Sequence, residues 1–115
     1  TFWNDWAGYA YSTTDWAQRP LGVQVLALAY RSGEAWNESA FANADFDTAL
    51  NKALSIADAD TRRETMAEIQ AIMRDEGVVI QPYWRSTYRH HKENVIGAEM
   101  HPTFEIHVYK LGLAA

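Results

Sequence analysis

Trp16 and Arg19 are the residues whose types and spacing best suit ligand binding in this chain. They lie in the stretch YSTTDWAQRPLG, residues 11–22, in which a β-prone, hydroxyl-rich half precedes Pro20. If a strand ends here and a helix begins, both side chains lie at the strand end, where α/β folds bind ligands. The Trp ring can pack on an apolar group, and the guanidinium can form forked hydrogen bonds with a carboxylate. A structural alternative, in which Arg19 pairs with Asp15 and Trp16 is simply buried, fits the spacing equally well.

The other polar residues do not predict a catalytic or metal centre. Adjacent His90 and His91 would point to opposite faces of a strand, and His101 and His107 are separated too widely in sequence for a local site. Most aspartates lie at expected helix starts, where they cap N–H groups. No nucleophile has a base beside it, and no phosphate-binding loop, GxSxG or HExxH motif occurs. We therefore expect no enzyme activity, no metal and no cofactor.

The composition narrows the class of protein further. The 115 residues are enough for one small domain, and 48% of them are hydrophobic. Lys and Arg number 10 against 15 Asp and Glu, so a nucleic-acid partner, which needs a basic surface, is not expected. There is no cysteine to form a disulfide or thiolate site. The start at Thr1, with neither Met nor a signal-peptide pattern, suggests a piece of a longer protein.

Two amphipathic helices are the strongest local prediction. Asp45 is expected to cap the first, over residues 46–57, and Thr61 with Glu64 matches the capping box of a second that ends at Gly77. We expect a helical hairpin whose apolar faces must be covered by a sheet or by another helix. The apolar residues recur at helical spacing, in the stripes Phe46, Leu50, Ala53, Leu54 and Ala57 and then Met66, Ile69, Ile72 and Met73.

Shorter elements are predicted before the hairpin. Residues 1–8 favour a helical turn capped by Thr1, and residues 9–16 are aromatic and β-branched, as is typical of a strand. Residues 20–33 favour a helix with Pro20 in its first turn, although a buried strand is the competing interpretation.

Strands are predicted after the hairpin. Residues 78–84 form an apolar run in which Pro82 predicts an edge strand or a bend, and residues 94–97 and 105–113 are two further candidates. The expected fold class is therefore α/β (α+β mixed), with the helical hairpin packed on a small mixed sheet.

A spaced pattern of residues runs from Trp36 to Trp84. It reads W-N, then F-x-N-x-x-F-D, an Ala near a helix end, D-x-x-x-R, and an Ile-Gln helix before the apolar run VVIQP. In order and spacing this pattern resembles the C-terminal part of the family 5 solute-binding proteins of ABC importers, the extracytoplasmic oligopeptide-, dipeptide- and nickel-binding receptors. The matching positions are Trp36, Asn37, Phe41, Asn43, Phe46, Asp47, Ala53, Asp58, Arg62, Ile69 and Gln70.

The resemblance implies the C-terminal part of a two-lobed, periplasmic-binding-protein-like fold. Residues 1–84 would belong to the second ligand-binding lobe, and residues 85–115 would cross back toward the first lobe and supply the C-terminal strands. The implied location is periplasmic, or extracellular and membrane-anchored in a Gram-positive host. The implied role is to capture a peptide-like or small solute and to deliver it to the membrane permease of an ABC importer.

The resemblance also gives the stretch around Trp16 an expected role. Peptide-binding members end the matching strand with W-x-x-D, in which the Trp lines the cleft and the Asp takes the amino terminus of the peptide. Here the matching positions are Trp16 and Arg19, so a base replaces the acid and favours a carboxylate or phosphate. We therefore expect an anionic or zwitterionic ligand, with Thr13 as a third candidate for the same crevice. Trp36 and Asn37 are expected to pin the long loop rather than to contact ligand.

Two other functions stay open on the sequence. Exposed aromatic residues and carboxylates could serve a carbohydrate-binding or hydrolytic domain, although sugar hydrolysis needs two carboxylates that face one cleft. A fragment separated from the rest of a receptor could instead self-associate through its uncovered apolar faces.

Overall fold

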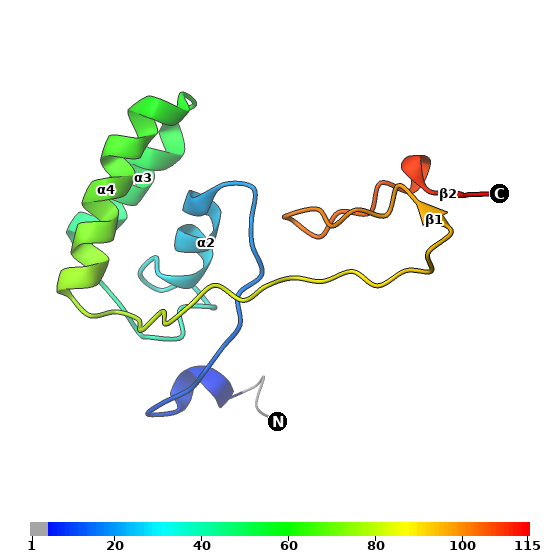
Figure 1. Cartoon of the computed structure of the whole chain (residues 1–115). Helices are drawn as coiled ribbons and strands as arrows, with labels where there is room; N and C mark the ends of the chain where they lie inside the picture. Colours follow the sequence, from blue (N-terminus) through cyan, green and yellow to red (C-terminus); the bar gives the residue numbers. More distant parts are fainter. Residues whose placement is uncertain (1–4) are drawn as a thin grey trace. The chain divides into compact units, whose positions relative to one another are not determined.

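The computed structural model describes residues 5–115 and divides the chain into two compact units, Thr1–Ile80 and Gln81–Ala115. The described residues of the first unit contain helices, and the second contains a two-stranded sheet, so the α+β class is confirmed at this coarse level (Figure 1). No helix of residues 5–115 is both long enough and apolar enough to cross a bilayer. The elements are η1 (Trp6–Gly8), α2 (Gly22–Ala29), α3 (Ala44–Ser55), α4 (Ala59–Asp75), β1 (Val95–Ile96), η2 (Val108–Lys110) and β2 (Gly112–Leu113).

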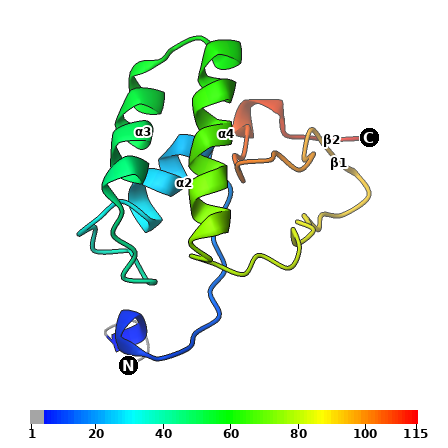
Figure 2. The ribbon, with the colours of Figure 1, turned by 90° about the vertical axis from the view of Figure 1, so that its left-hand side faces the viewer.

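The predicted helical hairpin is confirmed as α3 and α4, which lie side by side in both views (Figures 1 and 2). Phe46 and Leu50 of α3 and Ile69 of α4 are completely buried between them and α2. The predicted stripe of α3 is wrong at its end, because Leu54 is 45% exposed and the helix stops at Ser55, before Ala57. Met66, Ile72 and Met73 lie half-buried against the same core.

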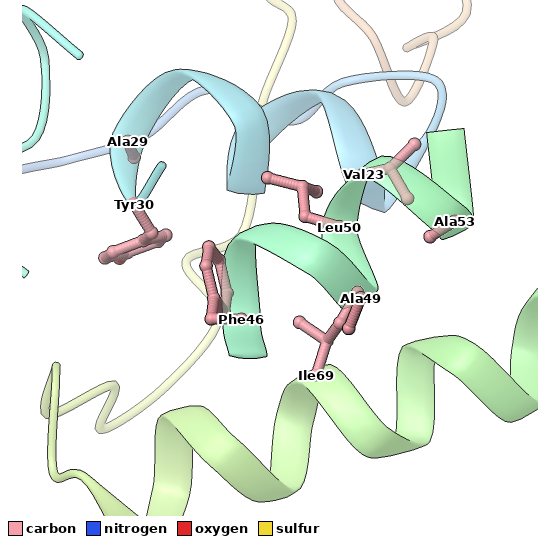
Figure 3. Close-up of a cluster of buried hydrophobic side chains, with 8 residues drawn as sticks. All are labelled: Val23, Ala29, Tyr30, Phe46, Ala49, Leu50, Ala53 and Ile69. Atoms are coloured by element: carbon pink, nitrogen blue, oxygen red, sulfur yellow. The ribbon is translucent and has the colours of Figure 1, made fainter. Parts of the chain in front are cut away.

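Helix α2, rather than a sheet, covers the hairpin in the first unit. The helix predicted within residues 20–33 is confirmed as Gly22–Ala29, although Pro20 lies before it and not in its first turn, and the competing buried strand is wrong. Val23 and Ala29, with Tyr30 just after the helix, belong to the same buried cluster as Phe46 and Leu50 of α3, and Tyr30 lies beside Phe46 (Figure 3). The predicted mixed sheet is wrong in type, because the strands that the structure describes form a two-stranded antiparallel sheet within residues 81–115.

The helix caps differ from those predicted. Asn43, not Asp45, caps α3, and its Oδ1 accepts hydrogen bonds from the backbone N–H groups of residues 45 and 46, both at 2.9 Å. Asp58 caps α4 and accepts from the N–H of Thr61 at 2.7 Å, so the predicted capping box of Thr61 and Glu64 is wrong. In both cases a polar side chain two or three residues earlier satisfies the first free N–H groups.

The predicted end of the second helix at Gly77 is confirmed. Gly77 adopts the left-handed conformation, with φ of +63°, which costs a residue without Cβ little. Its N–H donates to the carbonyl of Arg74 and that of Val78 donates to the carbonyl of Met73, both at 3.2 Å. These two bonds form a Schellman motif, which satisfies carbonyls at the helix end.

Most of the predicted strands are wrong. Residues 9–16 and 78–84 form no strand in the described part of the chain. Within residues 94–97 the strand is confirmed as β1, which pairs antiparallel with β2, Val95 opposite Leu113 and Ile96 opposite Gly112. Residues 105–113 contribute only β2 to the sheet, because η2 interrupts them.

The helical turn predicted in residues 1–8 is confirmed as the single 3-10 turn η1. Thr1, its predicted cap, lies outside the described residues.

Candidate functional site

Trp16 lies half-buried at the margin of the helical core. Its indole Nε1 donates a hydrogen bond to Glu38 Oε1 at 3.2 Å. Its ring meets that of Trp36 edge to face, with centroids 5.9 Å apart and an interplanar angle of 60°. These contacts fix both the plane and the rotation of the indole, so Trp16 can present a defined ring surface to a ligand.

Glu38 ties the extended N-terminal segment to the loop before α3. Its Oε1 accepts a second hydrogen bond from the Thr14 hydroxyl at 2.8 Å. Its Oε2 is buried and has no hydrogen-bond partner among residues 5–115. Burial, and secondly the negative charge of Glu38, raise the pKa of Tyr30. Sequence reasoning missed Glu38, and the available signal was its position directly after the pair Trp36 and Asn37.

Arg19 and Thr13 are both exposed. The exposed guanidinium of Arg19 can meet an anion from solution. Burial alternates along residues 11–17, as in a strand, and the inward set contains Thr14 and Trp16. The structure therefore brings Trp16 together with Thr14 and Glu38, whereas Thr13 belongs to the exposed set.

Asn37 holds the loop between α2 and α3 in a closed shape. Its side-chain amide donates to the carbonyls of Arg31 and Phe41 at 3.1 and 2.7 Å, and its Oδ1 accepts from the N–H of Phe41 at 3.2 Å. These bonds give Asn37 a structural role within the loop. Because Trp36 and Glu38 flank it, the same bonds also hold the two residues that contact Trp16.

Other members of the sequence pattern also make contacts that hold the helical unit together. The Asp47 carboxylate accepts from the N–H of Ser32 at 3.2 Å, which joins α3 to the loop. Arg62 of α4 donates to the carbonyl of Ile56, just after α3, at 2.7 Å. Phe41 packs edge to face on Phe46 with ring centroids 5.1 Å apart. These members of the pattern therefore have structural roles in this chain.

A surface groove of the first unit does not include the predicted site residues. It is an open groove of about 650 Å³ between α3 and α4, with four carboxylates and one lysine along it. Its polar lining offers no cluster of nucleophile and base. The groove is lined by Asn43, Asp45, Thr48, Ala49, Lys52, Glu68, Ala71, Ile72, Asp75 and Glu76.

In the second unit, His101, Glu105 and His107 converge. The prediction that the two histidines are too far apart for a local site is wrong, because their ring centroids lie 5.2 Å apart. His107 Nε2 is 3.0 Å from Glu105 Oε2, and His101 Nδ1 is 4.0 Å from Glu105 Oε1. The hydrogen bond from His107, then that from Thr103, then the charge of His101 lower the pKa of Glu105. Side chains of this chemistry are ligands for divalent transition metals.

Comparisons with protein-family models, with curated proteins and with solved structures found no match to this chain. The resemblance to solute-binding receptors therefore depends on the residue pattern of Trp36 to Trp84 alone.

Proposed function

We propose that this chain is part of an extracytoplasmic solute-binding receptor that delivers a peptide-like or small anionic or zwitterionic solute to an ABC importer. The observation that carries the proposal is that residues of the receptor-like pattern act together in one scaffold. Asn37 closes the loop, Asn43 caps α3, and Arg62 joins the end of α3 to α4. A chance match in sequence would not be expected to select residues that share one structural task.

The ligand-binding part of the proposal assigns separate roles to three residues. Trp16 supplies an apolar wall, Glu38 positions that wall through the indole N–H, and the exposed Arg19 supplies a positive charge. A guanidinium forms charge-assisted hydrogen bonds with a carboxylate or phosphate and repels an ammonium group. The preferred ligand therefore carries an acid group, alone or as part of a zwitterion.

The proposal includes two partners and a location. The membrane permease of an ABC importer receives the solute, and the receptor works in the periplasm or, in a Gram-positive host, on the outer face of the membrane. In such two-lobed receptors ligand is held by hinge closure, so both lobes contribute contacts.

The test is native mass spectrometry of the full-length protein that contains this chain, purified from its host without denaturation. The expected result is one small acid or peptide bound per molecule. The alternative of a carbohydrate-binding or hydrolytic domain, for which the exposed Tyr83, Trp84 and Tyr88 are candidates, predicts a bound glycan or turnover of a polysaccharide instead. Either of those results would contradict the proposal.

The role of Arg19 is tested with the ligand so identified. Loss of a charge-assisted hydrogen bond costs about 1.5–3 kcal/mol, so Arg19→Ala should weaken binding by about 10- to 100-fold. Arg63→Ala is the matched control, because Arg63 is an exposed arginine of α4 that pairs with Asp60 of the same helix. Unchanged affinity in Arg19→Ala, or equal losses in both variants, would refute the assignment of Arg19.

A further inference from the structure

We propose that His101, Glu105 and His107 form a binding site for a divalent transition-metal ion, with Zn²⁺ as the representative ion. One ligand atom from each residue lies within 4.8 Å of the other two. The cluster belongs entirely to residues 81–115, so the inference does not depend on the proposed receptor function.

The distances among the three ligand atoms suit a bound ion if the atoms move slightly toward one another. Three atoms that are at most 4.8 Å apart fit inside a sphere of radius about 2.8 Å, so one point lies no more than about 2.8 Å from each of them. Zinc bonds to imidazole nitrogen and carboxylate oxygen are about 2.0–2.2 Å long, so a donor at that outer limit must move inward by about 0.6–0.8 Å. The side chains are partly exposed, with 36% for His101, 54% for Glu105 and 30% for His107, and rotations of this size meet little resistance.

The backbone that carries the ligands is braced. Arg89 donates from its two terminal nitrogens to the carbonyls of Glu99 and Glu105, at 2.8 and 2.9 Å. The Thr103 hydroxyl lies 3.0 Å from Glu105 Oε1 and 2.9 Å from His101 Nδ1. Because Arg89 is bound to backbone carbonyls, its charge is not paired with the Glu105 carboxylate. A supported loop loses less conformational freedom when an ion binds.

The donor set selects the class of ion. Two imidazoles and one carboxylate suit Zn²⁺, Cu²⁺ or Ni²⁺, whereas Mg²⁺ and Ca²⁺ prefer all-oxygen ligands. Three protein ligands leave at least one position for water or another small ligand. A hollow of about 140 Å³ adjoins the cluster, and Gly97, Glu99, Met100 and Lys110 contribute to its walls.

The first test is isothermal titration calorimetry of the tag-free chain with Zn²⁺, in the presence of excess Mg²⁺. Wild type should bind one Zn²⁺ with saturation. His101→Ala and His107→Ala should each weaken binding by at least about tenfold, because even outer-shell partners of metal ligands contribute about 10- to 100-fold. His90→Ala is the matched control, since His90 is an exposed histidine outside the cluster, and its affinity should equal that of wild type.

A second measurement on the wild-type chain does not depend on whether the variants fold. In NMR spectra the imidazole signals of His101 and His107 should shift together with added Zn²⁺, while those of His90 and His91 stay in place. Absence of saturable binding would overturn the proposal and leave the cluster as a hydrogen-bonded network. An equal loss in His90→Ala, or equal shifts of all four histidines, would overturn it as well, because it would indicate nonspecific binding at the surface.

Discussion

Replacement of Leu50 by alanine should remove a large part of the stability of the helical unit. The Leu50 side chain has no exposed surface and lies between α2, α3 and α4 (Figure 3). The substitution removes three buried carbon atoms. At about 0.8 kcal/mol for each, the lost hydrophobic stabilisation is about 2.4 kcal/mol. The cavity left behind raises the loss to about 3–4 kcal/mol, within the range observed for buried leucines.

This loss is large compared with the total stability that a unit of this size can have. At about 0.05–0.15 kcal/mol per residue, the unit Thr1–Ile80 would have a free energy of unfolding of about 4–12 kcal/mol. A loss of about 3 kcal/mol corresponds to a fall in melting temperature of about 12–24 °C for a domain of 60–100 residues.

The matched control is Leu54→Ala. Leu54 lies one helical turn further along α3, and the apolar stripe in the sequence places it on the same face as Leu50. In the structure it is 45% exposed, so the same chemical change should cost less than about 1 kcal/mol. Thermal and urea unfolding of the full chain, followed by far-UV circular dichroism, would measure both losses, since the described α-helices all lie in the first unit.

Free energies of unfolding of Leu50→Ala and Leu54→Ala within about 0.5 kcal/mol of each other would contradict the described difference in burial between the two leucines. Equal large losses would mean that both leucines are buried, as the sequence stripe predicted. Equal small losses would mean that the core of α2, α3 and α4 does not form as described.

Three further changes test caps and close backbone contacts. Asn43→Ala should cost about 1 kcal/mol in unfolding free energy because two N–H groups lose their acceptor, whereas Asn43→Ser keeps a capping oxygen and should recover part of that loss. Bonds from the Thr61 side chain and then its N–H lower the pKa of Asp58. The Asp58 carboxylate therefore contributes its full stabilisation of the folded chain above about pH 4, and this stabilisation is lost as pH falls through the lowered pKa. Acid titration should then destabilise wild type relative to Asp58→Asn. Gly97→Ala would drive a Cβ into the Lys110 carbonyl, so NMR should show disruption of residues 81–115. Gly33→Ala is the control, because Gly33 has a similar φ but open space around it.

Elements with a strong local signal could be predicted from the sequence. The hairpin, the helix beginning at Gly22 and the stop at Gly77 follow from helical spacing and from one glycine in the left-handed conformation. The sequence could not decide which residue caps each helix. Asn43 and Asp45 are both suitable caps for α3, and Asp58 and Thr61 for α4, and each pair lies only two or three residues apart. Preferences among capping residues differ by only tenths of a kcal/mol, so nearby tertiary contacts decide between them.

The strands failed for a different reason. Residues 11–17 do alternate between exposed and half-buried positions, as the sequence predicted, but their inward side chains meet a loop and not a neighbouring strand. Strand formation requires a partner, and the sequence of one segment does not contain that information. Glu38 was missed for the same reason, since it meets Trp16 across 22 positions of sequence.

The histidine cluster could not be predicted because it depends on a backbone conformation that is rare for its residue. Phe104 has φ of +62°, in the left-handed region that residues with bulky side chains seldom adopt. The turn there, with the Phe104 N–H bonded to the His101 carbonyl at 2.9 Å, places Glu105 beside His101. The strand that we predicted over residues 105–113 would have kept His101 outside the cluster.

The resemblance to solute-binding receptors and the proposed choice of ligand depend on different residues. The matched pattern runs from Trp36 to Trp84, and its members hold the loop, the caps and the hairpin. Trp16 and Arg19 lie before that pattern, so a shared scaffold places no constraint on the charge of the ligand. Glu38 connects the two parts, because it belongs to the pinned loop and orients the Trp16 ring. A change at Arg19 should therefore alter ligand preference without loss of stability, whereas a change at Glu38 should alter both.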